Sequence, residues 1–216
     1  MDADETSTLS GALTQSGNIT IDVLTDKTLT YSGAALDIGA NTLTLLGGGT
    51  LTNTNNLVLS NANSKLLLNS ITLGSASTSS DSLGVDVDAN STITALTVSN
   101  TTPVSIADGV SLSGGIATTA GSINLDETGT LASTVTMAGG TLDVDETATV
   151  SGALTQSGDI TIDVLTDKTL SYSGAAVNLG ANTLTLTGGG TLSNTNAFVL
   201  NNADSLLSLS GIALSL

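Results

Sequence analysis

The chain has no cysteine, no arginine and no histidine, and its only basic residues are Lys27, Lys65 and Lys168. Without cysteine there is neither a disulfide framework nor a thiolate metal site. Nineteen acids against three lysines give the 216 residues a net charge of −16. Such a chain repels a phosphate backbone, so we expect no nucleic-acid partner.

Aromatic residues are nearly absent, and Pro103 is the single proline. No apolar run approaches the roughly 18 residues of a membrane helix, which predicts no membrane insertion. The acidic opening "MDADET" lacks a charged-then-apolar pattern, so we expect no targeting segment within the chain. Leu, Ile, Val and Ala are abundant enough to bury a sizeable core.

A long tandem repeat runs through the sequence. Residues 10–51 and 151–192 differ at only six of 42 positions when the chain is shifted by 141 residues. We therefore interpret residues 1–216 as one continuous unit of about one and a half copies, with copy one at 1–141 and a partial copy two at 142–216. We expect the chain to belong to a longer array of such copies.

A shorter period lies inside the long one, and such periods are typical of solenoids. Apolar residues recur at intervals of 19 to 23 and form a first ladder. Its members are Ile21, Leu43, Leu66, Val85, Val104, Ile123, Leu142, Ile162 and Leu184. A second ladder follows eight residues later, and its members are Leu29, Leu51, Ile93, Leu112, Leu131, Val150, Leu170 and Leu192. The constant separation predicts two strands and one turn of fixed geometry in each coil.

Local patterns indicate strand throughout. Stretches such as "KTLTYSG" and "DITIDV" alternate apolar with polar residues and are rich in Thr, Ile and Val. Glycine and asparagine separate them, as tight corners require. The sequence therefore predicts an all-β, right-handed parallel β-helix with about 20 residues and three short strands per coil.

The runs "NTLTLLGGGTL" and "NTLTLTGGGTL", with the bias toward Thr, Ser, Asn and Gly, resemble the β-helical stalks of large bacterial surface proteins. Those proteins are autotransporter passengers and filamentous-haemagglutinin-like exoproteins. The resemblance implies a secreted, cell-surface adhesive protein with an unknown surface or glycan ligand. It covers the whole chain through composition and period.

Paired acids occur in "DVD" at Asp86 and Asp88, and at Asp143 and Asp145. Acids of this kind serve in hydrolases, but the chain offers no aromatic or basic platform for a sugar beside them. Outward-facing residues on alternating strands account for the pattern. We therefore expect no enzymatic activity and no required cofactor.

Other acids fall three or four residues after the first ladder and predict a ridge along one corner. Its members are Asp88, Asp108, Asp126, Glu127, Asp145 and Glu146. Stacked like charges repel, so the ridge is either solvated or bridged by hard cations, of which Ca²⁺ is the candidate. A solvated edge is the favoured interpretation, because no established calcium-loop pattern is present.

Threonine and serine flank the second ladder on both sides, as at Thr28 and Thr30 or Thr50 and Thr52. Two hydroxyl columns of this kind resemble the surface of ice-binding β-solenoids. Threonine is also simply a good exposed strand residue. The favoured interpretation is a structural repeat module, a rigid stalk or adhesive segment of an extracellular bacterial protein. The alternatives are an ice-binding solenoid and a calcium-stabilised, self-associating fibre module. Expected partners are neighbouring repeats and, head to tail, further copies of the chain.

Overall fold

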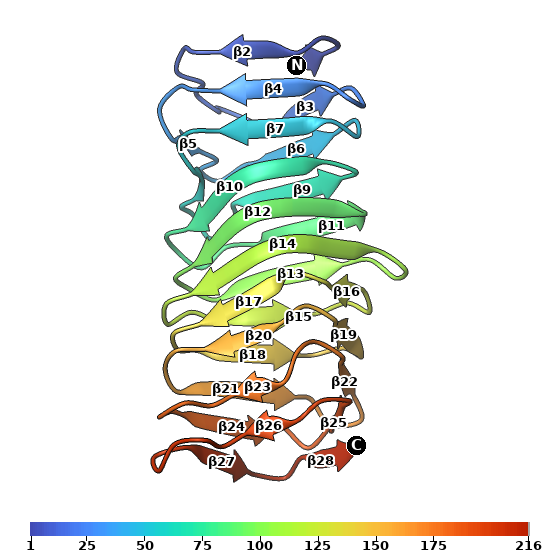
Figure 1. Cartoon of the computed structure of the whole chain (residues 1–216). Helices are drawn as coiled ribbons and strands as arrows, with labels where there is room; N and C mark the ends of the chain where they lie inside the picture. The colour runs from blue at the N-terminus through green and yellow to red at the C-terminus, as the bar shows by residue number, and fades with distance from the viewer. Residues whose placement is uncertain (216) are drawn as a thin grey trace.

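The computed structural model describes residues 1–215 as a β-solenoid of about 10 turns with about 21 residues per turn. Strands stack in parallel from coil to coil, and this range contains no helix. In Figure 1 the chain crosses the far side of each coil from left to right and returns on the near side, while it descends from the N-terminus. The winding is therefore right-handed, and the predicted fold is confirmed.

The first side of the coil is an 11-stranded parallel sheet. Its strands, in stacking order, are β1 (Asp2–Ala3), β3 (Ile19–Val23), β6 (Thr42–Leu46), β9 (Lys65–Asn69), β11 (Gly84–Ala89), β13 (Thr102–Ile106), β15 (Ile123–Leu125), β18 (Thr141–Val144), β21 (Ile160–Val164), β24 (Thr183–Thr187) and β27 (Leu206–Leu209). Buried and more exposed residues alternate along these strands, as the period-two pattern requires.

The second side carries the second ladder. Its strands are β2 (Ser7–Leu9), β4 (Thr28–Tyr31), β7 (Thr50–Asn53), β10 (Thr72–Thr78), β12 (Ser91–Val98), β14 (Ser111–Thr118), β16 (Thr130–Leu131), β19 (Ala148–Val150), β22 (Thr169–Tyr172), β25 (Thr191–Asn194) and β28 (Ala213–Ser215). The three longest strands, β10, β12 and β14, continue around the corner and form part of the third side as well (Figure 1).

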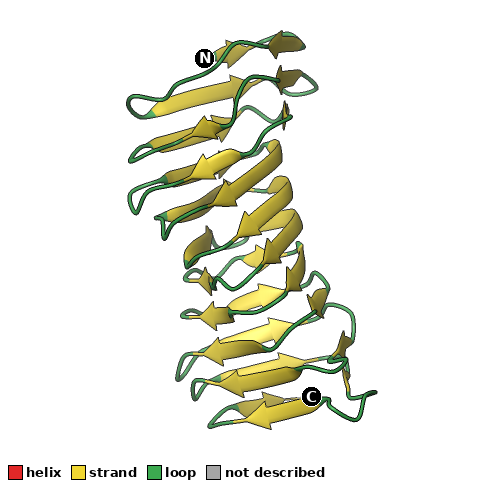
Figure 2. Ribbon diagram, turned by 90° about the vertical axis from the view of Figure 1, so that its left-hand side faces the viewer, coloured by secondary structure: helices red, strands yellow, loops and turns green. Residues whose placement is uncertain are grey.

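The third side is the least regular. Its separate strands are β5 (Leu36–Asp37), β8 (Leu57–Leu59), β17 (Thr134–Met137), β20 (Leu154–Gln156), β23 (Val177–Asn178) and β26 (Phe198–Val199). Figure 2 shows the coils as a stack of short arrows joined by loops at the corners. Coil length varies elsewhere as well: the corner between the first and second sides spans eight steps from Ile21 to Leu29, but six from their partners Leu45 to Leu51.

The interior is one continuous apolar cluster that extends from Ala3 in the first coil to Leu192 near the last. All seventeen ladder residues lie in it, and none is more than 4% exposed. No helical segment in residues 1–215 has the length and apolar character needed to cross a membrane.

The stacking register on the first side differs from the predicted one at three steps. The predicted neighbours were Ile21 and Leu43, Val104 and Ile123, and Ile162 and Leu184. In the structure Ile21 pairs with Leu45, Ile123 with Thr102, and Ile162 with Leu186. Each difference is two residues. A shift of two keeps every apolar side chain inside, so hydrophobic spacing cannot distinguish the two registers.

A glycine run fixes one of these registers. Gly47 has a φ of 108°, and a Cβ at this position would lie 2.4 Å from the carbonyl oxygen of Val23. The amide of Gly49 donates to that same carbonyl over 2.9 Å. Only residues without a side chain can approach the preceding coil so closely. The run therefore places β6 two residues away from the register that ladder spacing predicts.

The second side has two such differences. The predicted neighbours were Ile93 and Leu112, and Val150 and Leu170, but Leu112 pairs with Ser91 and Leu170 with Ala148. Opposite Ile93 stands Gly114, whose φ is 113° and whose Cβ would lie 1.8 Å from the Ile93 oxygen. The ladder contact at this step is therefore replaced by a close approach between backbones.

Candidate functional site

Outward-facing acids gather at the middle of the first side. Asp86, Asp88, Asp126 and Glu127 form what we call the acidic surface. Asp86 lies in β11 beside β9, and its Oδ2 is 2.6 Å from the Nζ of Lys65. Both side chains of this ion pair are partly buried. The pair ties two neighbouring coils together and offsets part of the local negative charge.

The carboxylates of the acidic surface are close enough to influence one another. Partial burial, followed by the charges of Asp86, Asp126 and Asp88, raises the pKa of Glu127 above its ordinary value, whereas Lys65 lowers it. The hydroxyl of Ser105 donates to Asp126 Oδ1 over 2.6 Å. The surface is therefore an anionic patch that is only partly neutralised by the protein itself.

A second acidic group lies further along the same side. Register places Asn124, Asp143 and Asp163 side by side on β15, β18 and β21. The Asn124 amide donates to Asp145 Oδ2 over 3.0 Å. Burial raises the pKa of Asp143, and the charges of Asp145 and Asp163 raise it further, while a hydrogen bond from the Val144 backbone lowers it.

Four of the six predicted ridge residues lie on two neighbouring coils. The amides of Asp145 and Glu146 both donate to the carbonyl of Leu125, which directly precedes Asp126 and Glu127. Glu146 accepts a hydrogen bond from Lys168 over 2.5 Å, and Asp108 is an exposed residue after β13. Among residues 1–215 no group of three acids has an arrangement that could hold a metal ion. Calcium binding therefore stays a prediction.

Hydroxyl side chains line the outer face of the second side. Thr28, Thr50, Thr72 and Thr92 pair in sequence across β4, β7, β10 and β12, and Ser113 continues this threonine row on β14. The hydroxyls of Thr92 and Ser113 lie 2.7 Å apart and share a hydrogen bond. The second predicted column is interrupted, because its position on β10 is occupied by Gly74.

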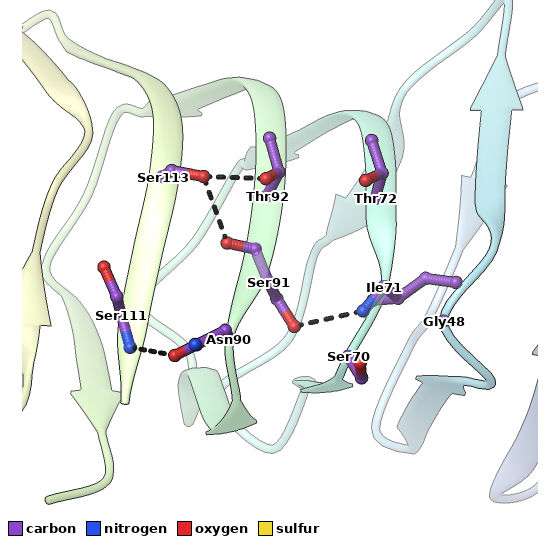
Figure 3. A pocket seen from close by; sticks show the side chains of 9 residues that line it. All are labelled: Gly48, Ser70, Ile71, Thr72, Asn90, Ser91, Thr92, Ser111 and Ser113. Carbon is purple, nitrogen blue, oxygen red and sulfur yellow. Dashed lines mark hydrogen bonds between the residues drawn. The ribbon is translucent and has the colours of Figure 1, made fainter. Parts of the chain in front are cut away.

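An open groove of about 360 Å³ borders the threonine row at the corner between the first and second sides. Figure 3 shows its lining, in which Asn90 accepts a hydrogen bond from the Ser111 amide and Ser91 accepts one from the Ile71 amide. Its side chains are mostly hydroxyls and one amide, without charge or aromatic ring. Much of the hydrogen-bonding capacity is used within the wall itself.

Two interior cavities are much smaller than this groove. Each has a volume of about 10 Å³ and is lined by apolar ladder residues and by Tyr31 or Tyr172. They are far smaller than the sites of small-molecule ligands. Both tyrosines stand at matching repeat positions, and each hydroxyl donates to a backbone carbonyl three residues later.

Sequence reasoning missed two features of these surfaces. It did not pair Lys65 with Asp86, and it did not place Asp143 beside Asp163. Both contacts join residues about one coil apart, and the shared alternation in "LDVD" and "TIDV" is the signal that would have indicated the second one.

Comparison with known protein families, curated proteins and solved structures finds no match to this chain. Its surfaces must therefore be interpreted from their own chemistry.

Proposed function

We propose that the chain is a structural repeat module, a rigid stalk segment of a large extracellular bacterial surface protein that lacks enzymatic activity. The observation that carries this proposal is the unbroken apolar interior, in which every coil rests on its neighbours. In such an array the stability is a sum over coils and their interfaces. The outward residues are mostly short polar ones, so their substitution should change the stability of the stacked coils little.

The bacterial and surface-exposed setting is supported by the resemblance of the "NTLTLLGGGTL" runs to β-helical stalks. An adhesive role requires a surface that binds a partner. The polar groove beside the threonine row is the candidate for this surface. A glycan array with the whole chain tests this role. Binding that is lost in Ser111→Trp would support adhesion through the groove, and an empty array would leave the spacer role alone.

A coil deletion tests the spacer role. Residues 123–141 form one complete coil, because Ile123, Leu131 and Val135 each pair with the residue 19 positions later. Removal of these residues should give a folded rod shorter by about 4.8 Å. Small-angle scattering and circular dichroism measure length and fold.

The matched control removes only residues 123–132. This half-coil deletion breaks the register on all three sides and should unfold the surrounding coils. If both deletions unfold the chain to the same extent, the coils are not interchangeable and the spacer role is rejected.

The threonine row supports a second candidate, ice binding. Its members repeat at strand spacing of about 4.8 Å and face outward from a regular sheet. Inhibition of ice recrystallisation by the whole chain, lost in Thr72→Asp and kept in Thr44→Asp on the first side, would support it. No inhibition in the unmodified chain would exclude it.

The acidic surface supports the third alternative, a calcium-stabilised module. Because repulsion between its carboxylates opposes folding, a bound divalent cation would raise the melting temperature. Thermal melts in calcium and in a chelator, at equal ionic strength, test this candidate. Magnesium serves as the control for simple charge screening.

A further inference from the structure

The parallel sheet of the third side is interrupted at one step of the stack. β20 pairs with β17 of the preceding coil and β23 pairs with β26 of the following coil, but β20 and β23 do not pair with each other (Figure 1). No backbone hydrogen bond joins residues 153–158 to residues 174–182. The same two coils are paired on the other sides, through β18 with β21 and β19 with β22. They are therefore held together by strand pairing on two sides of three.

The interruption recurs 141 residues earlier, at the same place of the first copy. Residues 12–17 and 33–41 share no backbone hydrogen bond, and β5 pairs only with β8. Every step between these two interruptions has a strand pairing on the third side, namely β5–β8, β8–β10, β10–β12, β12–β14, β14–β17 and β17–β20. The unpaired step is therefore a feature of the long repeat.

A tyrosine hydroxyl bridges the interruption in place of the missing backbone bonds. The Tyr172 hydroxyl accepts a hydrogen bond from the Leu154 amide over 3.1 Å and donates one to the Ala175 carbonyl over 2.6 Å. Tyr31 makes the two equivalent bonds in the first copy. Both tyrosines are buried. One side-chain atom thus joins strands that are joined elsewhere by several backbone groups.

A buried glutamine lies at the other end of the same interruption. Gln156 is 6% exposed, and its Nε2 donates to the Thr183 carbonyl over 3.4 Å, while its Oε1 has no partner in the protein. Gln15 is 8% exposed in the first copy and likewise leaves its Oε1 without a partner. One of the interior cavities of about 10 Å³ lies at this step and is lined by Leu154 and Val177 among others.

These features make the unpaired step weaker than its neighbours. In a solenoid the stability is a sum over the coils and the interfaces between them. This interface lacks the strand pairing of one side and contains a buried amide oxygen without a partner, which costs free energy. The cavity also removes packing contacts. An interface of this kind opens at a lower free energy than the one that unfolds the whole chain.

We propose that the unpaired step is a hinge. The third side opens between β20 and β23 while β18–β21 and β19–β22 stay paired, and the Tyr172 hydroxyl stabilises the closed state. Because the opening is confined to one side, it bends the rod away from that side. The two hinges lie seven coils apart, which is about 34 Å at about 4.8 Å per coil. The inference extends the proposed function without being required by it, because a chain without a hinge that tolerates the coil deletion would remain a stalk segment.

The test introduces one cysteine at a time into a chain that has none and measures how fast the thiol reacts with a soluble disulfide reagent. Val177→Cys reports on the third side beside the interruption. Val135→Cys reports on the third side where both neighbouring strands are paired, and Val164→Cys reports on the first side of the coil that contains Val177. The three valines are at most 1% exposed, so each thiol reacts only when its surroundings open.

We expect Val177→Cys to react fastest, at a rate that changes little with urea, because opening of the hinge exposes little surface. The thiols of the other two variants should react slowly and with a steep dependence on urea, because global unfolding exposes them. Tyr172→Phe combined with Val177→Cys should raise the rate about tenfold without changing its urea dependence. Circular dichroism shows whether each variant is folded.

Three results would overturn the proposal. Equal rates at the three positions would mean that the stack opens as one unit. Equally fast reaction of Val177→Cys and Val164→Cys would mean that the whole coil detaches instead of opening on one side. An unchanged rate in Tyr172→Phe would mean that the hydroxyl does not stabilise the closed state.

Discussion

Leu131→Asp and Thr130→Asp place the same charge on adjacent residues of one strand, and they should differ greatly in effect. Leu131 is 0% exposed and pairs with Leu112 and Val150 inside the core. Thr130 points outward between Ser111 and Thr149. The pair therefore tests directly which face of β16 is buried.

The expected loss at Leu131 has two parts. Removal of a fully buried leucine side chain costs about 2–5 kcal/mol of unfolding free energy. An ionised carboxylate in the same place costs more, and a buried aspartate avoids this by a pKa raised by up to about 3–5 units. The sum at neutral pH exceeds about 5 kcal/mol. Thr130→Asp changes only an outward residue and should cost about 1 kcal/mol or less.

Urea unfolding followed by circular dichroism measures both variants. The pKa of the buried aspartate is raised on folding, so its penalty grows as pH rises above the ordinary value of about 3.9. The difference in unfolding free energy between the two variants should therefore become smaller in acid. Equal unfolding free energies at neutral pH would refute the assignment of faces, and a gap independent of pH would refute the burial of the new carboxyl.

Three further predictions concern single positions. Burial and neighbouring carboxylates raise the pKa of Asp143, so its ionisation lowers the free energy of unfolding as the pH rises above the ordinary pKa of an aspartate. Asp143→Asn should therefore raise the free energy of unfolding at neutral pH and change it little in acid. Urea unfolding at the two pH values measures this difference. Tyr172→Phe should cost about 1–3 kcal/mol, because it leaves the Leu154 amide, now 3.1 Å from the phenol oxygen, without its partner; a thermal melt with no change would contradict this. Gly114→Ala should destabilise by about 1–3 kcal/mol, because its φ of 113° and its approach to the Ile93 oxygen exclude a side chain; unfolding at unchanged urea concentration would contradict the close contact.

The solenoid could be predicted from the sequence because its core residues recur at regular intervals along the chain. Residues such as Leu66, Val85 and Leu131 recur at coil spacing, and each must face inward for the stack to be stable. The fixed step of eight residues also predicted a turn of constant geometry, and this prediction was wrong, because the positions that pair with residues 21–29 are residues 45–51. Burial of these residues follows from their pattern alone.

Register was harder to predict because strand alternation has a period of two. Ile21 could pair with Leu43 or with Leu45, and either choice buries apolar residues on both strands. The decision rests on backbone contacts at glycines such as Gly47, which carry no hydrophobic signal. The spacing of the apolar residues therefore does not distinguish registers that differ by two residues. The backbone conformation of the turn between the two strands is needed to choose between them.

The outward contacts were the least predictable for the same physical reason. A side chain such as Lys65 can reach any of several neighbours on the adjacent coil, and the two-residue registers decide which of them lies beside it. An error of two residues leaves the core intact but changes every outward pairing. The ladder spacing accordingly did not indicate the individual partners of the acids, such as the ion pair between Lys168 and Glu146.

This division between inside and outside also bears on how such a chain can acquire function. Inward residues pack against both neighbouring coils, so exchanges between the copies stay apolar, as the buried residues Leu36 and Val177 show. Outward residues can change in chemical character between the copies, as Lys65 and Leu206 show. Differences in activity between copies should therefore arise on the outer faces, while the property common to all copies is the ability of one coil to cover the next.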